Sequence, residues 1–219
     1  MTRFSPPARR LFILLGLLAY QSVRAQVPVY LFIGPQAVRA SYHINGQRQT
    51  SDAVPGVQAG VSARIDFDHR LYFVPAVYYS LKGFRVAFDR PSLPPDALAM
   101  NNHATVHTLE MAPLLQYDFS DRPSHFFVRL GPSLDFQLYG RERFQLKDGT
   151  VVERRMLYDF THYGRYAASA IGHAGYENGR MLVYLQYTQG LTNLDNTEGG
   201  PVIQYRAAGI TIARALNRR

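Results

Sequence analysis

The chain has 219 residues, 47% of them hydrophobic, and 24 Lys and Arg against 16 Asp and Glu give a formal net charge of +8. This length suits one domain of ordinary size, and the hydrophobic content argues against a disordered chain. The sequence has no cysteine, which excludes disulfides, thiolate metal sites and cysteine nucleophiles.

The first 25 residues have the pattern of a secretory signal peptide. Three arginines precede an apolar core at 11–20, and the segment ends at Ala25. The core is shorter than the roughly 20 residues of a spanning helix, so we predict a signal peptide at 1–25 and a mature domain at 26–219. An uncleaved N-terminal anchor helix is the alternative. Cleavage removes four arginines, so the charge falls to 20 − 16 = +4 and gives no support for nucleic-acid binding.

The rest of the chain alternates apolar and polar residues with a period of two, which predicts β-strands. Eight segments share this pattern. One of them, 160–176, is so rich in Ala and Gly that its two faces cannot be assigned. The alternation is regular over 57–67, 71–81, 109–119 and 126–138, and weaker over 29–40, 160–176, 181–191 and 202–214. Soluble strands average about 5–6 residues, whereas a membrane-spanning strand needs about 9–11, so the lengths favour a membrane barrel.

The connections between these strands alternate in length. Short links are predicted at 68–70, 120–125 and 177–180, the last with an Asn-Gly turn, and long links at about 41–54, 87–104, 140–158 and 192–200. With eight strands, every short turn then lies at one end, together with both termini. This asymmetry is typical of outer-membrane proteins, and we predict an all-β fold, an eight-stranded antiparallel up-and-down transmembrane β-barrel.

One face of the predicted strands is apolar and the other carries charges. The charged face holds Arg64, Asp66, Lys82, Glu110, Arg129 and Asp135. In a membrane barrel the apolar face meets lipid and the charges turn inward, whereas a soluble barrel has the opposite sense. Because eight strands enclose a narrow interior filled by side chains, we expect Arg64, Lys82 and Arg129 to pair there with Glu110, Asp66 and Asp135.

Three prolines lie inside predicted strands. Pro75, Pro113 and Pro132 cannot donate a hydrogen bond to a neighbouring strand. We expect a β-bulge at each, because an extra residue relieves the missing donor.

Four segments resemble the PorT-like family of small outer-membrane β-barrel proteins of Bacteroidetes. They are PAVYYSLKG at 75–83, LEMAPLLQY at 109–117, FVRLGPSL at 127–134 and YTQGLTN at 187–193, in the family's order. The resemblance implies an eight-stranded barrel in an outer membrane and implies little about activity. The chain departs from the family at Ala76, where Glu is usual, at the extra Ala112 before Pro113, and at a C-terminus without a terminal aromatic residue.

Motifs of catalysis and cofactor binding are absent from the sequence. His103 and His107 lie close in sequence, but on a strand they would be about 13 Å apart, which disfavours a metal pair. His162 or His173 with Ser169 would be the candidates for a lipid-modifying enzyme, although nothing in their spacing selects them. We therefore predict no catalytic, cofactor-binding or metal-binding residue and no cofactor.

The aromatic and loop residues point to the membrane surface. Many of the 28 Tyr and Phe are expected in interfacial girdles. The tyrosines considered are Tyr72, Tyr79, Tyr117, Tyr139, Tyr158, Tyr163, Tyr176, Tyr184 and Tyr187. In the loops, 141–155 holds five cations against three anions, with a hairpin turn predicted at 147–150, and prolines stiffen 91–95.

The sequence thus favours a non-enzymatic integral outer-membrane barrel with a structural or interaction role through its long external loops. Expected partners are outer-membrane lipid and lipopolysaccharide, with a protein or glycan partner at the loops and no nucleic acid. The alternatives are a lipid-modifying barrel enzyme and a soluble periplasmic lipocalin-like carrier. The sequence names no ligand and no oligomeric state.

Overall fold

The computed structural model describes residues 27–216, and its secondary structure is entirely β. The predicted signal peptide at 1–25 lies outside the described residues. Over 27–216, no helix is long and apolar enough to cross a bilayer. The strands are β1 (Val29–Ile44), β2 (Gln47–Arg48), β3 (Thr50–Asp52), β4 (Val54–Ala63), β5 (Ile65–Asp68), β6 (Leu71–Ala87), β7 (Asn101–Asp118), β8 (Ser124–Gln145), β9 (Val151–Arg155), β10 (Tyr166–Asn178), β11 (Met181–Gly190) and β12 (Val202–Ala215).

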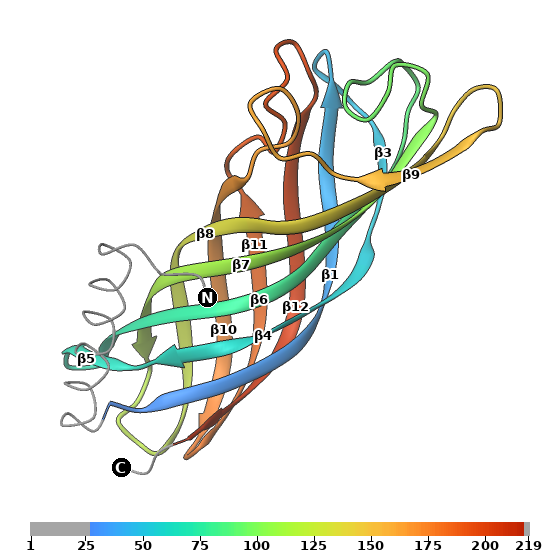
Figure 1. Ribbon diagram of the computed structural model, residues 1–219. Helices are drawn as coiled ribbons and strands as arrows, with labels where there is room; N and C mark the ends of the chain where they lie inside the picture. The colour runs from blue at the N-terminus through green and yellow to red at the C-terminus, as the bar shows by residue number, and fades with distance from the viewer. Residues whose placement is uncertain (1–26, 217–219) are drawn as a thin grey trace, which may run out of the picture.

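Eight long strands close into an antiparallel barrel, as predicted (Figure 1). Each strand pairs with the next in the order β1, β4, β6, β7, β8, β10, β11 and β12, and β12 pairs back with β1. The short strands β2, β3 and β9 extend the barrel wall at the loop end, and β5 continues β4 at the turn end. Closure leaves no free edge among the long strands. A bilayer requires such closure because its hydrocarbon offers no hydrogen-bond partner to an unpaired edge.

The connections are segregated by length, as predicted. Tight turns follow Asp68, Asp118 and Asn178 at one end, and long loops gather at the other (Figure 1). The strands reach further into the loop end than alternation predicts: β7 begins at Asn101 and β8 continues to Gln145. Beyond the bilayer both faces of a strand tolerate polar residues, so the apolar alternation fades while the pairing continues.

The outer face of the barrel is apolar and the inner face is polar, as in a membrane barrel. Ile33 and Leu130 on the outer face are 60% and 66% exposed, whereas Lys82 and Glu110 inside are 3% and 1% exposed. In β10, where the sequence left the faces open, Ser169 points inward and is buried. A belt of exposed apolar side chains around a polar interior has no place in a soluble carrier, so the lipocalin-like alternative is wrong.

The interior is packed in layers. An apolar cluster built around Tyr42, Phe84 and Tyr205 fills the loop end, and a second around Phe127 and Tyr184 fills the turn end. Between them Lys82 pairs with Glu110 at 2.8 Å and Asp135 at 2.7 Å, as predicted. The two cavities within the lumen have volumes of about 10 Å³ each, which is room for about one water.

Two of the predicted interior pairs are wrong. Arg64 pairs with Asp118 and Glu177, whereas Asp66 is exposed on β5. Arg129 has no ion pair within 27–216. Its Nε donates to Gln116 at 2.5 Å, and its guanidinium lies over the rings of Phe127 and Tyr184 at 4.7 and 5.4 Å from their centroids. Parity predicts which residues face inward but not which strands bring them together.

The predicted proline bulges are also wrong. Pro75 lies directly opposite Pro113, and the β7–β8 register runs unchanged past Pro113 and Pro132. That register places Pro113 and Pro132 opposite each other. Because both lack a backbone N–H at the same level, a single interruption of the hydrogen bonds between β7 and β8 accommodates both prolines, and no strand has to bulge.

A real bulge lies near the loop end, where the register of β7 and β8 shifts between His107 and Thr108. Because one residue of β8 is added there, inward parity changes from odd to even. Tyr139 therefore lies on the outer face beside His107, with ring centroids 5.6 Å apart.

Aromatic side chains form two girdles on the outer face, as predicted for part of the tyrosines. Tyr79, His107 and Tyr139 lie side by side toward the loop end, and Tyr117, with Phe119, lies at the turn end. In β7 the belt from Leu109 to Tyr117 has the nine-residue length that spans hydrocarbon. Other tyrosines lie inside the barrel: Tyr72, Tyr163 and Tyr184.

Candidate functional site

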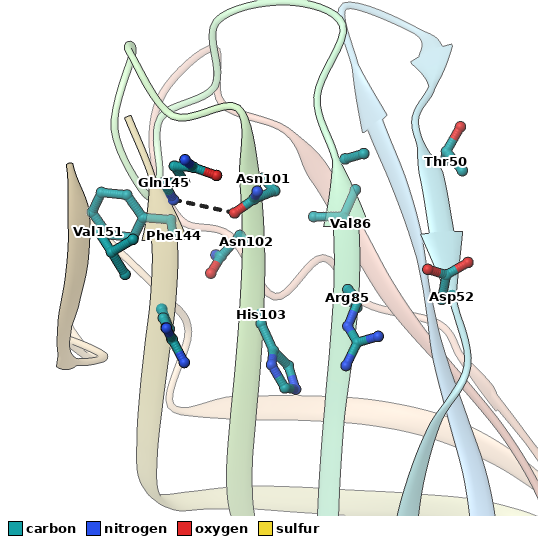
Figure 2. A pocket seen from close by; sticks show the side chains of 12 residues that line it. Thr50, Asp52, Arg85, Val86, Asn101, Asn102, His103, Phe144, Gln145 and Val151 are labelled. Atoms are coloured by element: carbon teal, nitrogen blue, oxygen red, sulfur yellow. Dashed lines mark hydrogen bonds between the residues drawn. The ribbon is translucent and has the colours of Figure 1, made fainter. Parts of the chain in front are cut away.

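A pocket of about 410 Å³ opens at the loop end, beyond the upper aromatic girdle (Figure 2). Its walls come from β3, β6, β7, β8 and the start of β9, all of which extend past the apolar belt. His103 lies four residues above His107, about 13 Å along the strand, and so stands clear of the hydrocarbon. The pocket therefore faces the layer in which lipid headgroups and external solutes meet the protein.

Strand register sets three basic side chains in one row across this pocket. Arg85 of β6 pairs with His103 of β7, and His103 pairs with Arg143 of β8. Neighbouring strands are about 4.8 Å apart, so the two arginines begin about 10 Å from each other with the imidazole between them. Figure 2 shows Arg85 and His103 extending side by side from their strands.

Neither arginine of the row contacts a carboxylate in the part of the chain that the structure describes. Within 27–216, neither Arg85 nor Arg143 forms an ion pair, although strand register places Asp52 opposite Arg85 and Glu153 opposite Arg143. Other arginines nearby are neutralised: Arg154 lies 2.7 Å from Glu142. The guanidinium groups of Arg85 and Arg143 are thus not engaged by a direct contact with a carboxylate of the described chain, and both can reach a ligand.

The surroundings of His103 in this row change the pKa of its imidazole. Partial burial of His103, followed by repulsion from Arg85 and Arg143, holds the pKa of His103 below its usual value of 6.5. At neutral pH the ring is therefore uncharged, and an anion held by the two arginines would favour its protonation.

A buried network on the inner side of the same strands holds the row in place. Tyr163 donates to Glu142 Oε2 at 2.7 Å, Asn102 donates to the same oxygen at 3.3 Å, and Arg154 donates to Glu142 Oε1 at 2.7 Å. On the outer side the backbone N–H of Gln145 donates to Asn101 Oδ1 at 3.1 Å (Figure 2). Asn102 and Glu142, which precede His103 and Arg143 in the chain, are thereby held in place.

Loops close the outer mouth above the lumen. Tyr42 donates to the carbonyl of Pro94 at 3.0 Å and Arg154 to that of Pro95 at 2.7 Å, so the proline-rich 91–95 segment is tied to the barrel. The hairpin predicted at 147–150 is confirmed, with Gly149 in the left-handed region at φ 88°.

The histidines considered from sequence do not assemble a catalytic or metal site. His107 lies against Tyr79, 2.6 Å from its hydroxyl, and His103 belongs to the basic row. Ser169 donates to Asp135, the ring of His173 is stacked on Tyr184, and His162 lies in an outer loop beside Asp159. The basic row was missed because its members are at positions 85, 103 and 143, which only the strand register brings together.

Comparison with known proteins agrees with the fold. A family model described as outer membrane protein beta-barrel domain matches residues 18–196. No curated protein matches the sequence.

Three solved structures are similar in shape. The attachment invasion locus protein Ail of Yersinia pestis, solved with the heparin analogue sucrose octasulfate, is 9% identical with a TM-score of 0.46, over 87% of this chain and 99% of that one. Neisserial surface protein A is 13% identical with a TM-score of 0.44, over 85% and 96%. The toluene transporter TodX of P. putida is 8% identical with a TM-score of 0.27, over 88% and 91%.

Proposed function

Because the chain belongs to the family of outer membrane protein beta-barrel domains, we propose that it is a non-enzymatic barrel that binds anionic groups at its outer rim. The protein is an integral protein of the outer membrane. The anionic ligand we assign is the phosphate of lipopolysaccharide, which surrounds the rim in the outer leaflet. We also assign residues 1–25 to a cleaved signal peptide, 26–219 to the barrel, and the chain to the PorT-like branch on its four ordered segments.

The observation that carries this proposal is the pair of guanidinium groups at either side of His103, those of Arg85 and Arg143, which form no ion pair among residues 27–216. Guanidinium groups bind phosphate through two parallel hydrogen bonds, and such charge-assisted bonds are about twice as strong as neutral ones. The row is at the height of the headgroups because it lies just beyond the upper girdle.

The test is binding of lipid A to the refolded barrel in detergent, by calorimetry, with dephosphorylated lipid A as the ligand control. We expect the double variant R85Q/R143Q to lose about tenfold in affinity or more per arginine, since a hydrogen bond to a charged group contributes about 1.5–3 kcal/mol. Arg180, exposed in the turn between β10 and β11, gives the matched control R180Q, which should bind as the unmodified protein does. Equal binding of the dephosphorylated lipid would refute the proposal.

A further inference from the structure

Three side chains that can ligate a metal meet inside the turn end of the barrel, far from the rim pocket. Asp118 ends β7, His125 is the second residue of β8, and Glu177 is next to last in β10. His125 and Glu177 are direct cross-strand partners, and all three residues are buried. One potential ligand atom from each lies within 4.8 Å of the others.

The hydrogen bonding of His125 fixes which of its nitrogens faces the carboxylates. Nδ1 lies 2.7 Å from the carbonyl oxygen of Arg122, and a carbonyl only accepts, so Nδ1 carries the proton. Nε2 then directs its lone pair toward Asp118 Oδ2 at 2.9 Å and Glu177 Oε2 at 3.6 Å. The side chain is 6% exposed, and within 27–216 Nε2 makes no hydrogen bond of acceptable geometry. Both of these oxygens also accept from the Arg64 guanidinium, whereas Nε2 is left without a partner in the described chain, and a buried polar atom without a partner is costly.

The local charge is also unbalanced. Arg64 is the guanidinium that pairs with both Asp118 and Glu177, so one positive charge meets two negative charges. Arg129 is the next cation, but it donates to Gln116 and forms no ion pair with either carboxylate in the described chain. A proton on His125 or a metal ion would restore the balance.

The distances from Nε2 to the two carboxylate oxygens are compatible with a metal ion. Zinc bonds of about 2.0–2.2 Å in a tetrahedron place neighbouring ligands about 3.3–3.6 Å apart, and the distances of 2.9 and 3.6 Å from Nε2 lie within about 0.4 Å of that range. One imidazole nitrogen and two carboxylate oxygens are ligands that zinc accepts. A histidine that ligates a metal commonly donates its other N–H to a backbone carbonyl, as His125 does to Arg122.

We propose that Asp118, His125 and Glu177 form a site for a divalent transition metal, with Zn²⁺ the ion it fits best. The ion would join β7, β8 and β10 at the turn end and would share Asp118 Oδ2 and Glu177 Oε2 with Arg64. This proposal is independent of the rim pocket.

The experiment is a titration of the refolded, chelator-treated barrel with ZnCl₂ at pH 7.5, followed by calorimetry and by the heat-dependent shift in gel mobility. We expect one Zn²⁺ per barrel and a higher unfolding temperature with the ion bound. H125Q should weaken binding by about 100-fold or more, beyond the roughly 10–100-fold that loss of an outer hydrogen-bond partner causes. H162Q, which removes an exposed histidine beside Asp159, is the control and should retain the site.

The unmodified protein alone decides the proposal if H125Q fails to fold. A folded barrel that takes up no Zn²⁺, with an imidazolium at His125 seen by NMR at pH 7.5, would show that a proton fills the gap and would overturn the metal site. Stoichiometric binding that persists unchanged in folded H125Q would overturn it as well.

Discussion

The polar layer at the middle of the lumen makes a prediction about stability that can be worked out from its contacts. Lys82 lies between Glu110 and Asp135 at 2.8 and 2.7 Å, and its side chain is 2% exposed. In K82M a side chain of similar length replaces the lysine, but two carboxylates then face each other without a cation. Removal of one partner from a buried ion pair costs about 3–5 kcal/mol.

That cost lowers the folding equilibrium constant by about 10²- to 10⁴-fold, since about 1.4 kcal/mol corresponds to a factor of ten. The assay is urea unfolding in phospholipid vesicles followed by far-ultraviolet circular dichroism, because the chain has no tryptophan to report by fluorescence. The triple variant K82M/E110Q/D135N should regain much of the loss, because its neutral amides need no counter-charge.

The matched control is Lys147, at the exposed tip of the β8–β9 hairpin. K147M makes the same chemical change away from any buried partner and should alter the free energy of unfolding by no more than about 0.5 kcal/mol. If K82M falls within about 1 kcal/mol of the unmodified barrel, the ionic layer is not the source of stability that its burial implies.

Three further outcomes follow from the structure. Because the pKa of His103 is held below 6.5, lipid A binding should strengthen between pH 7.5 and 5.5 as the ring takes up a proton, and parallel pH profiles for the unmodified protein and H103Q would contradict this. Ala76 lines the same small cavity as Arg129, which has a volume of about 10 Å³, so the larger side chain of A76E should cost about 1–3 kcal/mol in urea unfolding, and an unchanged or higher stability would contradict the packed lumen. Val77 faces the lipid, so V77R should cost about 2–4 kcal/mol in vesicles, whereas V151R in the hairpin should cost little, and equal costs would contradict the assigned membrane level.

The architecture was predictable because it depends on local repetition. Side chains such as Val61 and Lys82 alternate with a fixed period of two, and hydrocarbon accepts only one of the two faces. Loop length then orders the ends of the barrel. These signals need no knowledge of which residues touch.

Pairing depends instead on register, which a single sequence does not contain. Arg64 does not pair with Asp66, two residues further along the chain, because Asp66 is exposed on β5 at the turn end. Arg64 instead reaches Asp118 and Glu177 on other strands. The bulge beside His107 reverses the parity of β8 beyond it and carries Tyr139 outward. The same dependence on register explains why neither the rim row nor the turn-end cluster was found.

The packed lumen and the rim pocket are linked through the strands they share. Arg143 lies between Glu142 and Phe144, both of which are buried in the outer part of the core, and Arg85 lies between Phe84 and Val86, which are buried there too. The backbone beneath each guanidinium is therefore fixed before a ligand arrives, and binding orders only the arginine side chains. Ordering one such side chain costs about 0.5–1.5 kcal/mol, whereas each hydrogen bond to a charged group contributes about 1.5–3 kcal/mol. Most of the energy of each hydrogen bond therefore contributes to the binding affinity. The tightly packed lumen thus makes the outer face of the barrel rigid enough to hold Arg85, His103 and Arg143 in one row.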